Sequence, residues 1–184
     1  MFARRQFLVL GGLGALGLAW GARAAEPTAT VQLPAYPPAG PSAADYQAQA
    51  RRLAELAAEA ARQRPNSVLN FTPESLRIVD DMLAEAAAHA PPLTDERKRE
   101  VVQAFGCYVL EVARREFGGA YQWSDGDRGP MLVVGDPDFQ ISLVTWPRIA
   151  KRLGGDPAAS LSAVYQGFAD RARAAAPGDK AAFG

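Results

Sequence analysis

Glu111 has the clearest potential for chemistry in this sequence, because it is the only charged residue in a largely apolar run between Val101 and Val112. A carboxylate withdrawn from water is costly unless it is paired, so Glu111 is a candidate acid, base or anchor for a ligand cation. Arg114 and Arg115 follow at the spacing of ion pairs within a helix. A structural ion pair is therefore the favoured interpretation of Glu111, and a functional carboxylate is the alternative.

The other reactive side chains lack the partners that catalysis requires. Cys107 stands among apolar neighbours, which favours a buried packing thiol over a reactive one. His89 precedes two prolines at a predicted helix end, where it can cap free carbonyls. One Cys and one His fall short of the clustered ligands of zinc, copper, haem and iron–sulfur sites. We therefore expect no catalytic constellation, no metal and no cofactor.

Two acidic segments resemble calcium-binding loops only in composition. Asp125-Gly126-Asp127 and Asp136-Pro137-Asp138 do not have the full ligand spacing that ends in a glutamate, so they are expected to be solvated turns. A hydrolase that uses Glu111 together with Asp125 is the alternative.

Aromatic and arginine side chains gather near the predicted strands. Trp123, Trp146 and Arg128 are of the types that protein interfaces favour, and with Glu111 they are the candidate binding residues. The alternative is that the two tryptophans fill the seam between helix and sheet.

The elements that must position these residues follow from periodicity. A helix is predicted over 42–64, a second from Thr72-Pro73 to the prolines at 91 and 92, and a third, apolar all round, from Thr94 to Gly118-Gly119. Short strands are predicted over 120–123, 131–134 and 139–144, followed by helices over 148–153 and from Asp156-Pro157 onward. This order predicts an α+β fold with three N-terminal helices, a three-stranded antiparallel meander and two C-terminal helices.

The first 24 residues are typical of a cleavable export signal. Arg4 and Arg5 precede an apolar, glycine-rich run that contains Phe7 and Leu8, and the small residues Ala22 and Ala24 mark a cleavage site. Paired arginines followed by Phe and Leu indicate the twin-arginine class, with an ordinary secretory signal as the alternative. We therefore expect contact with the twin-arginine translocase and signal peptidase, a periplasmic location, and a signal-anchored protein if cleavage fails.

The mature chain would hold one domain. Residues 1–24 contain three of the 20 basic residues and none of the 20 acids, which leaves 17 basic and 20 acidic residues and argues against nucleic-acid binding. Residues 25–41 are proline-rich and are expected to be a linker, with a proline-rich ligand segment as the alternative. Residues 42–175 would form the domain and residues 176–184 a flexible tail.

Three motifs carry a resemblance to a known group of domains. They are Asn70-Phe71-Thr72-Pro73-Glu74-Ser75-Leu76, Phe105-Gly106-Cys107-Tyr108-Val109-Leu110-Glu111-Val112, and Gly118-Gly119 with Trp123. Together they resemble small bacterial domains of unknown function in which a "speSL" helix start, a "GaYlGEv" helix and a "GG.W" strand recur, although Leu110 stands where that pattern often has a glycine. The resemblance covers about residues 68–166 and implies the fold but no chemistry. The sequence as a whole thus favours a periplasmic, non-enzymatic binding domain.

Overall fold

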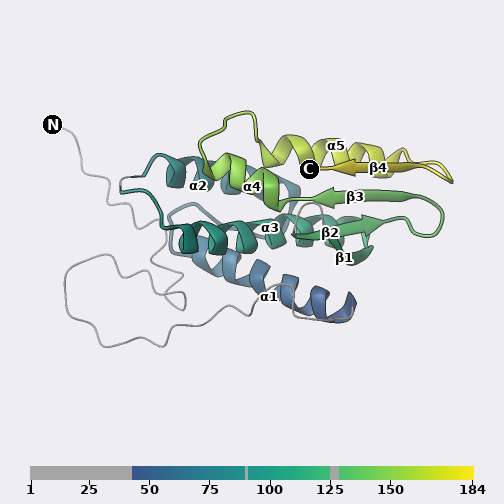
Figure 1. Ribbon diagram of the computed structural model, residues 1–184, viewed down its shortest axis with the longest axis horizontal. Helices are drawn as coiled ribbons and strands as arrows, with labels where there is room; N and C mark the ends of the chain where they lie inside the picture. The colour runs from purple at the N-terminus through teal and green to yellow at the C-terminus, as the bar shows by residue number, and fades with distance from the viewer. Residues whose placement is uncertain (1–42, 90, 125–128) are drawn as a thin grey trace.

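A computed structural model describes residues 43–89, 91–124 and 129–184. The expected signal and linker lie outside the described residues, as do Asp125 and Arg128. The elements, in chain order, are α1 (Ala43–Arg62), the 3-10 turn η2 (Pro73–Ser75), α2 (Leu76–Ala87), α3 (Asp95–Phe117), β1 (Ala120–Ser124), β2 (Gly129–Val134), β3 (Gln140–Val144), α4 (Trp146–Leu153), α5 (Leu161–Arg173) and β4 (Lys180–Phe183) (Figure 1). The predicted α+β class is confirmed.

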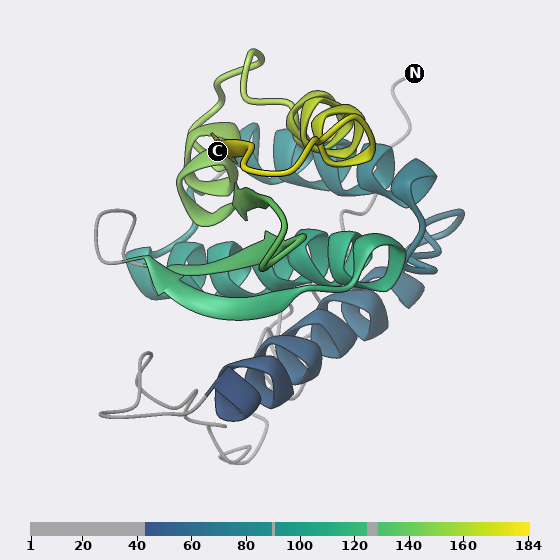
Figure 2. The same ribbon diagram turned by 90° about the vertical axis from the view of Figure 1, so that its right-hand side faces the viewer.

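Helix α3 is the centre of the described fold. It begins after Thr94, whose hydroxyl accepts a hydrogen bond from the Arg97 amide at 3.3 Å, and it ends at Gly118, which has a φ of 71°. Its residues from 104 to 113 are all buried. Figure 2 shows α3 running along one face of the sheet, with α1 on one side of it and α2, α4 and α5 on the other. The prediction of a buried central helix is confirmed.

Helix α1 packs along α3 through small side chains. The alanines at positions 50, 54, 57, 58 and 61 are each at most 3% exposed. Because alanine projects so little from the helix surface, the two helix axes can approach closely.

The sheet has the strand order β1-β2-β3-β4. The first three strands are antiparallel neighbours, as predicted, and β4 is parallel to β3. Tyr121 of β1 pairs with Leu132 of β2, which pairs with Leu143 of β3. All three are at most 1% exposed and belong to the core under α3 and α5. Gly119, just before β1, is required because a Cβ there would lie 2.3 Å from the Val133 carbonyl oxygen.

The predicted flexible tail is wrong, because residues 180–183 form β4. Ile141 and Leu143 of β3 stand beside Ala181 and Phe183 in the parallel register. The Phe183 ring meets the ring of Phe168 in α5 edge-on, with centroids 6.3 Å apart. The domain therefore extends beyond residue 175, and the sheet is a mixed four-stranded sheet rather than a three-stranded meander.

Two helix starts also differ from the prediction. Helix α5 begins at Leu161 rather than near Asp156, because Ser160 provides the cap and accepts from the Ala163 amide at 3.2 Å. Before α2, Pro73 opens a 3-10 turn, and the Thr72 hydroxyl donates to the Asn70 side chain at 3.0 Å instead of capping the helix.

Candidate functional site

Glu111 is completely buried, and arginines of its own helix enclose its carboxylate. Arg114 donates from Nε to Oε2 at 2.8 Å and from an Nη to Oε1 at 2.9 Å, while Arg115 donates from Nε to Oε1 at 3.0 Å. The Tyr121 hydroxyl of β1 adds a contact of 3.3 Å to Oε2. Both carboxylate oxygens are therefore occupied by donors, and both predicted arginine partners are present.

The electrostatics of Glu111 are those of a paired, ionised acid. Burial is the largest influence and favours the neutral form, but the hydrogen bonds and charges of Arg114 and Arg115 together outweigh it and hold the pKa of Glu111 below its ordinary value. Burial and the neighbouring Glu111 charge raise the pKa of Tyr121, so its hydroxyl stays protonated and can donate. An acid held ionised and surrounded by donors is poorly suited to general acid or nucleophilic chemistry.

A second polar layer connects this ion pair to the turn before α2. The Arg115 guanidinium lies 3.7 Å from the centre of the Phe71 ring. The Phe71 amide donates to the Tyr108 hydroxyl at 2.8 Å, and the Ser75 hydroxyl is 2.7 Å from the same oxygen. Phe71 has a φ of 61°, unusual for a bulky residue, and these contacts hold it in that conformation. The Glu111 cluster therefore joins η2, α3 and β1.

The two candidate tryptophans pack within the fold. Trp123 lies two residues after Tyr121 on β1, so its side chain points to the same, inner face. Its ring stacks on Tyr46 of α1, with centroids 6.2 Å apart, and meets Trp146 edge-on at 6.1 Å. Both tryptophans remain partly exposed. This arrangement matches the seam-filling alternative, while Arg128, the third interface candidate, lies outside the described residues.

Gly106 of α3 makes room for Trp146. A Cβ at position 106 would lie 2.3 Å from Trp146 Cδ1. The Thr145 hydroxyl donates to the Gly106 carbonyl at 3.0 Å, which fixes the start of α4 against α3.

Cys107 and His89 have structural surroundings. Burial raises the pKa of the Cys107 thiol to about 12, with a smaller opposing influence from a hydrogen bond with the Trp146 side chain, so the thiol is not a nucleophile in the folded state. His89 Nδ1 lies 3.2 Å from the Pro91 carbonyl oxygen, just beyond the end of α2. The hydrogen bonds described for the Glu111 carboxylate come from Arg114, Arg115 and Tyr121, and not from Cys107 or His89.

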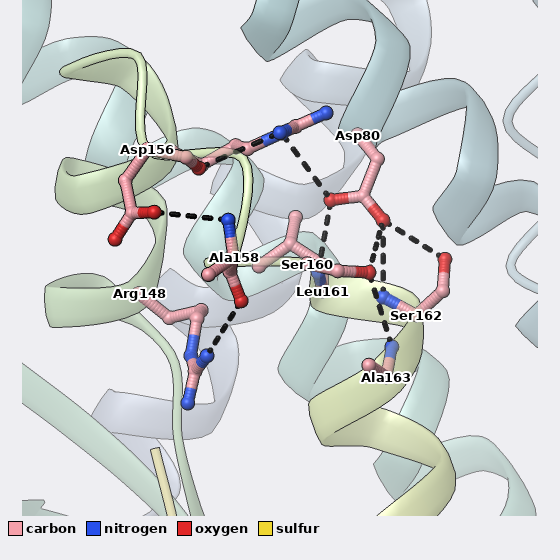
Figure 3. A network of polar contacts seen from close by, with 9 residues as sticks. Asp80, Arg148, Asp156, Ala158, Ser160, Leu161, Ser162 and Ala163 are labelled. Atoms are coloured by element: carbon pink, nitrogen blue, oxygen red, sulfur yellow. Dashed lines mark hydrogen bonds and ion pairs between the residues drawn. The ribbon is translucent and has the colours of Figure 1, made fainter.

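Asp80 forms a polar network that the sequence did not predict (Figure 3). From α2 it accepts hydrogen bonds from the amides of Leu161 and Ser162 at 2.9 and 3.1 Å, and from the hydroxyls of Ser160 and Ser162 at 3.1 and 3.0 Å. Arg152 Nε lies 3.9 Å from Oδ1 of Asp80. Asp80 therefore caps the positive end of α5 from another helix. Its partners lie about 80 residues away along the chain, and local pattern carries no signal for such a contact.

A groove of about 400 Å³ lies where the end of α2, the first turns of α3 and the end of α4 meet. Its described lining is Ala86, Ala87, Pro92, Leu93, Lys98, Val102, Ala150, Leu153 and Gly154. Lys98 is the one charged residue of that set, and its Nζ is 3.5 Å from Asp95, whose side chain is 88% exposed. The volume lies in the range of ligand pockets.

Within the described ranges, no group of three or more His, Cys, Asp or Glu side chains is placed to hold a metal ion. Among the described helices, none is long and apolar enough to cross a membrane. Comparison with known protein families, with curated proteins and with solved structures finds no match to this chain.

Proposed function

We propose that this protein is an exported, non-enzymatic binding domain that engages a protein or another component of the bacterial envelope. The groove between α2, α3 and α4 carries the proposal. It is concave, its described lining side chains other than Lys98 are apolar, and none of its described lining residues is an acid, a histidine, a thiol or a hydroxyl. Such a surface can bury an apolar group of a partner, and among its described lining residues Lys98 has no acid, histidine or hydroxyl beside it in that set with which to form a hydrolytic site.

The arrangement of Glu111 supports the same proposal. A carboxylate-dependent hydrolase would need this acid in an open pocket beside a second acid. Instead, its oxygens accept hydrogen bonds from Arg114, Arg115 and Tyr121. Asp125, the second acid of the alternative hydrolase, lies outside the described residues.

The groove can be tested by filling it. Ala150 is exposed on α4 and lines the groove, so Ala150→Trp should occupy it, whereas Ala163→Trp adds the same ring to an exposed position on α5. We expect the wild-type protein and Ala163→Trp purified from the periplasm to retain a common bound component that Ala150→Trp loses. Equal recovery of that component with all three proteins would show that the groove does not bind it.

The export part of the proposal depends on Arg4 and Arg5. Replacing both by Lys should stop export through the twin-arginine route, because that route reads the arginine pair. Fractionation of cells should then find the variant in the cytoplasm. An unchanged periplasmic yield would assign the signal to the ordinary secretory class and leave the binding proposal intact.

A further inference from the structure

The described chain begins beside an aromatic cluster, which we define as Tyr46, Trp123 and Trp146. Tyr46 lies in the first turn of α1 and stacks on Trp123 at an angle of 16°, and Trp146 meets Trp123 at 90°. All three residues are partly exposed, and the Cδ1–Nε1 edge of Trp146 is turned inward against Gly106 of α3. They come from α1, β1 and α4, so the folded domain assembles a surface of neighbouring aromatic rings that no single segment contains.

The segment that precedes α1 has the composition that such surfaces bind. Residues 34–41 read Pro-Ala-Tyr-Pro-Pro-Ala-Gly-Pro and contain the pattern Pro-x-x-Pro twice, at Pro34 with Pro37 and at Pro38 with Pro41. A polyproline II helix has three residues per turn, so prolines three apart lie on one face. Aromatic-lined grooves recognise that face, and binding costs little entropy because proline restricts the free segment.

We propose that residues 34–41 bind across the aromatic cluster of the same chain. Pro41 precedes the first described residue, Ala43, by two positions, which span at most about 7 Å. Tyr46, the nearest ring of the cluster, is three residues into the helix. The proline-rich segment is thus tethered next to its binding surface at an effective concentration of about 1 mM. A proline-rich partner would have to displace this intramolecular contact.

Tryptophan emission tests this contact directly. The chain has three tryptophans, and Trp20→Phe leaves only the two in the cluster. In that full-length background, replacing the prolines at 34, 37, 38 and 41 by Ser should shift the emission to longer wavelength and make acrylamide quenching faster, with far-UV circular dichroism of the domain unchanged. Pro27→Ser, which leaves both Pro-x-x-Pro pairs intact, should change neither property.

A peptide of residues 33–42, added to the proline-substituted protein, should restore the original emission at about 1 mM, the level that matches the tethered segment. A scrambled peptide should not. Unchanged emission and quenching in the proline-substituted protein would overturn the proposal. The proposal would also be overturned if the difference in emission between the Trp20→Phe protein and its proline-substituted variant disappeared on dilution. The segment bound to the aromatic cluster would then belong to a second copy of the chain.

Discussion

Glu111→Gln removes the charge at the centre of the buried network while keeping the shape of the side chain. Breaking a buried ion pair costs about 3–5 kcal/mol when the remaining partner is also buried. The side chains of Arg114 and Arg115 are 20% and 42% exposed, so water can solvate part of their charge. We therefore expect the free energy of unfolding to fall by about 2 kcal/mol.

Urea denaturation of the purified protein measures this loss. With a slope of about 2 kcal/mol per molar urea, the midpoint should fall by about 1 M at pH 7. Glu59→Gln is the matched control, because Glu59 pairs with Arg62 on α1 at the same i,i+3 spacing but both side chains are more than half exposed. That control should change the free energy by less than about 0.5 kcal/mol. Equal shifts in the two variants would refute the structural account of Glu111.

The stabilisation by Glu111 also has a defined pH dependence. Because its arginine partners hold the pKa of Glu111 in the folded state below the ordinary value of 4.5, the stabilising contribution is fully present above that ordinary value. It is lost as the pH falls through the lower pKa of the folded state. The difference between wild type and Glu111→Gln should therefore be constant from pH 6 to 8 and shrink as acid is added, whereas a pH-independent difference would contradict the ion-pair explanation.

Three further outcomes follow from the packing. Asp80→Asn should lower the free energy of unfolding by about 2 kcal/mol, because it weakens four hydrogen bonds at the start of α5. In the same urea assay, Asp81→Asn at the exposed neighbouring position should have little effect. Gly106→Ala should lower the free energy of unfolding by about 1–3 kcal/mol, because the added methyl group would lie 2.3 Å from Trp146. Gly167→Ala, whose added methyl group would have its nearest contact at 3.4 Å, should be neutral or stabilising. Opposite results for the two variants in thermal melts would contradict this packing. Cys107 should react with a thiol reagent at pH 8 only after unfolding, and rapid labelling of the native protein would show that its thiol is accessible.

Local sequence patterns were sufficient for most helices and for the Glu111 ion pair. The partners of Glu111 lie three and four residues away on one helix, so their spacing alone predicts the contact. Thr94, the acidic first turn and Gly118 likewise mark the ends of α3 in its own sequence. These features could be predicted because each depends on residues within one or two helical turns.

The features that sequence reasoning missed depend on distant parts of the chain. Strand β4 has only four residues, and it is ordered by parallel pairing with β3 and by the contact between Phe183 and Phe168. Asp80 has no helical neighbour that would reveal its role as the cap of α5. The groove, similarly, exists only where three separate helices meet. Such contacts are determined by tertiary packing, on which the local pattern carries little information.

Site-specific photo-crosslinking in living cells tests the binding proposal most directly. A photoreactive amino acid at position 150 lies in the groove between α2, α3 and α4, and the same amino acid at position 163 lies on the exposed surface of α5. We predict a discrete adduct from position 150 of the exported protein and none from position 163. No adduct at position 150, or equal adducts at both positions, would contradict the proposal that this groove is the binding site.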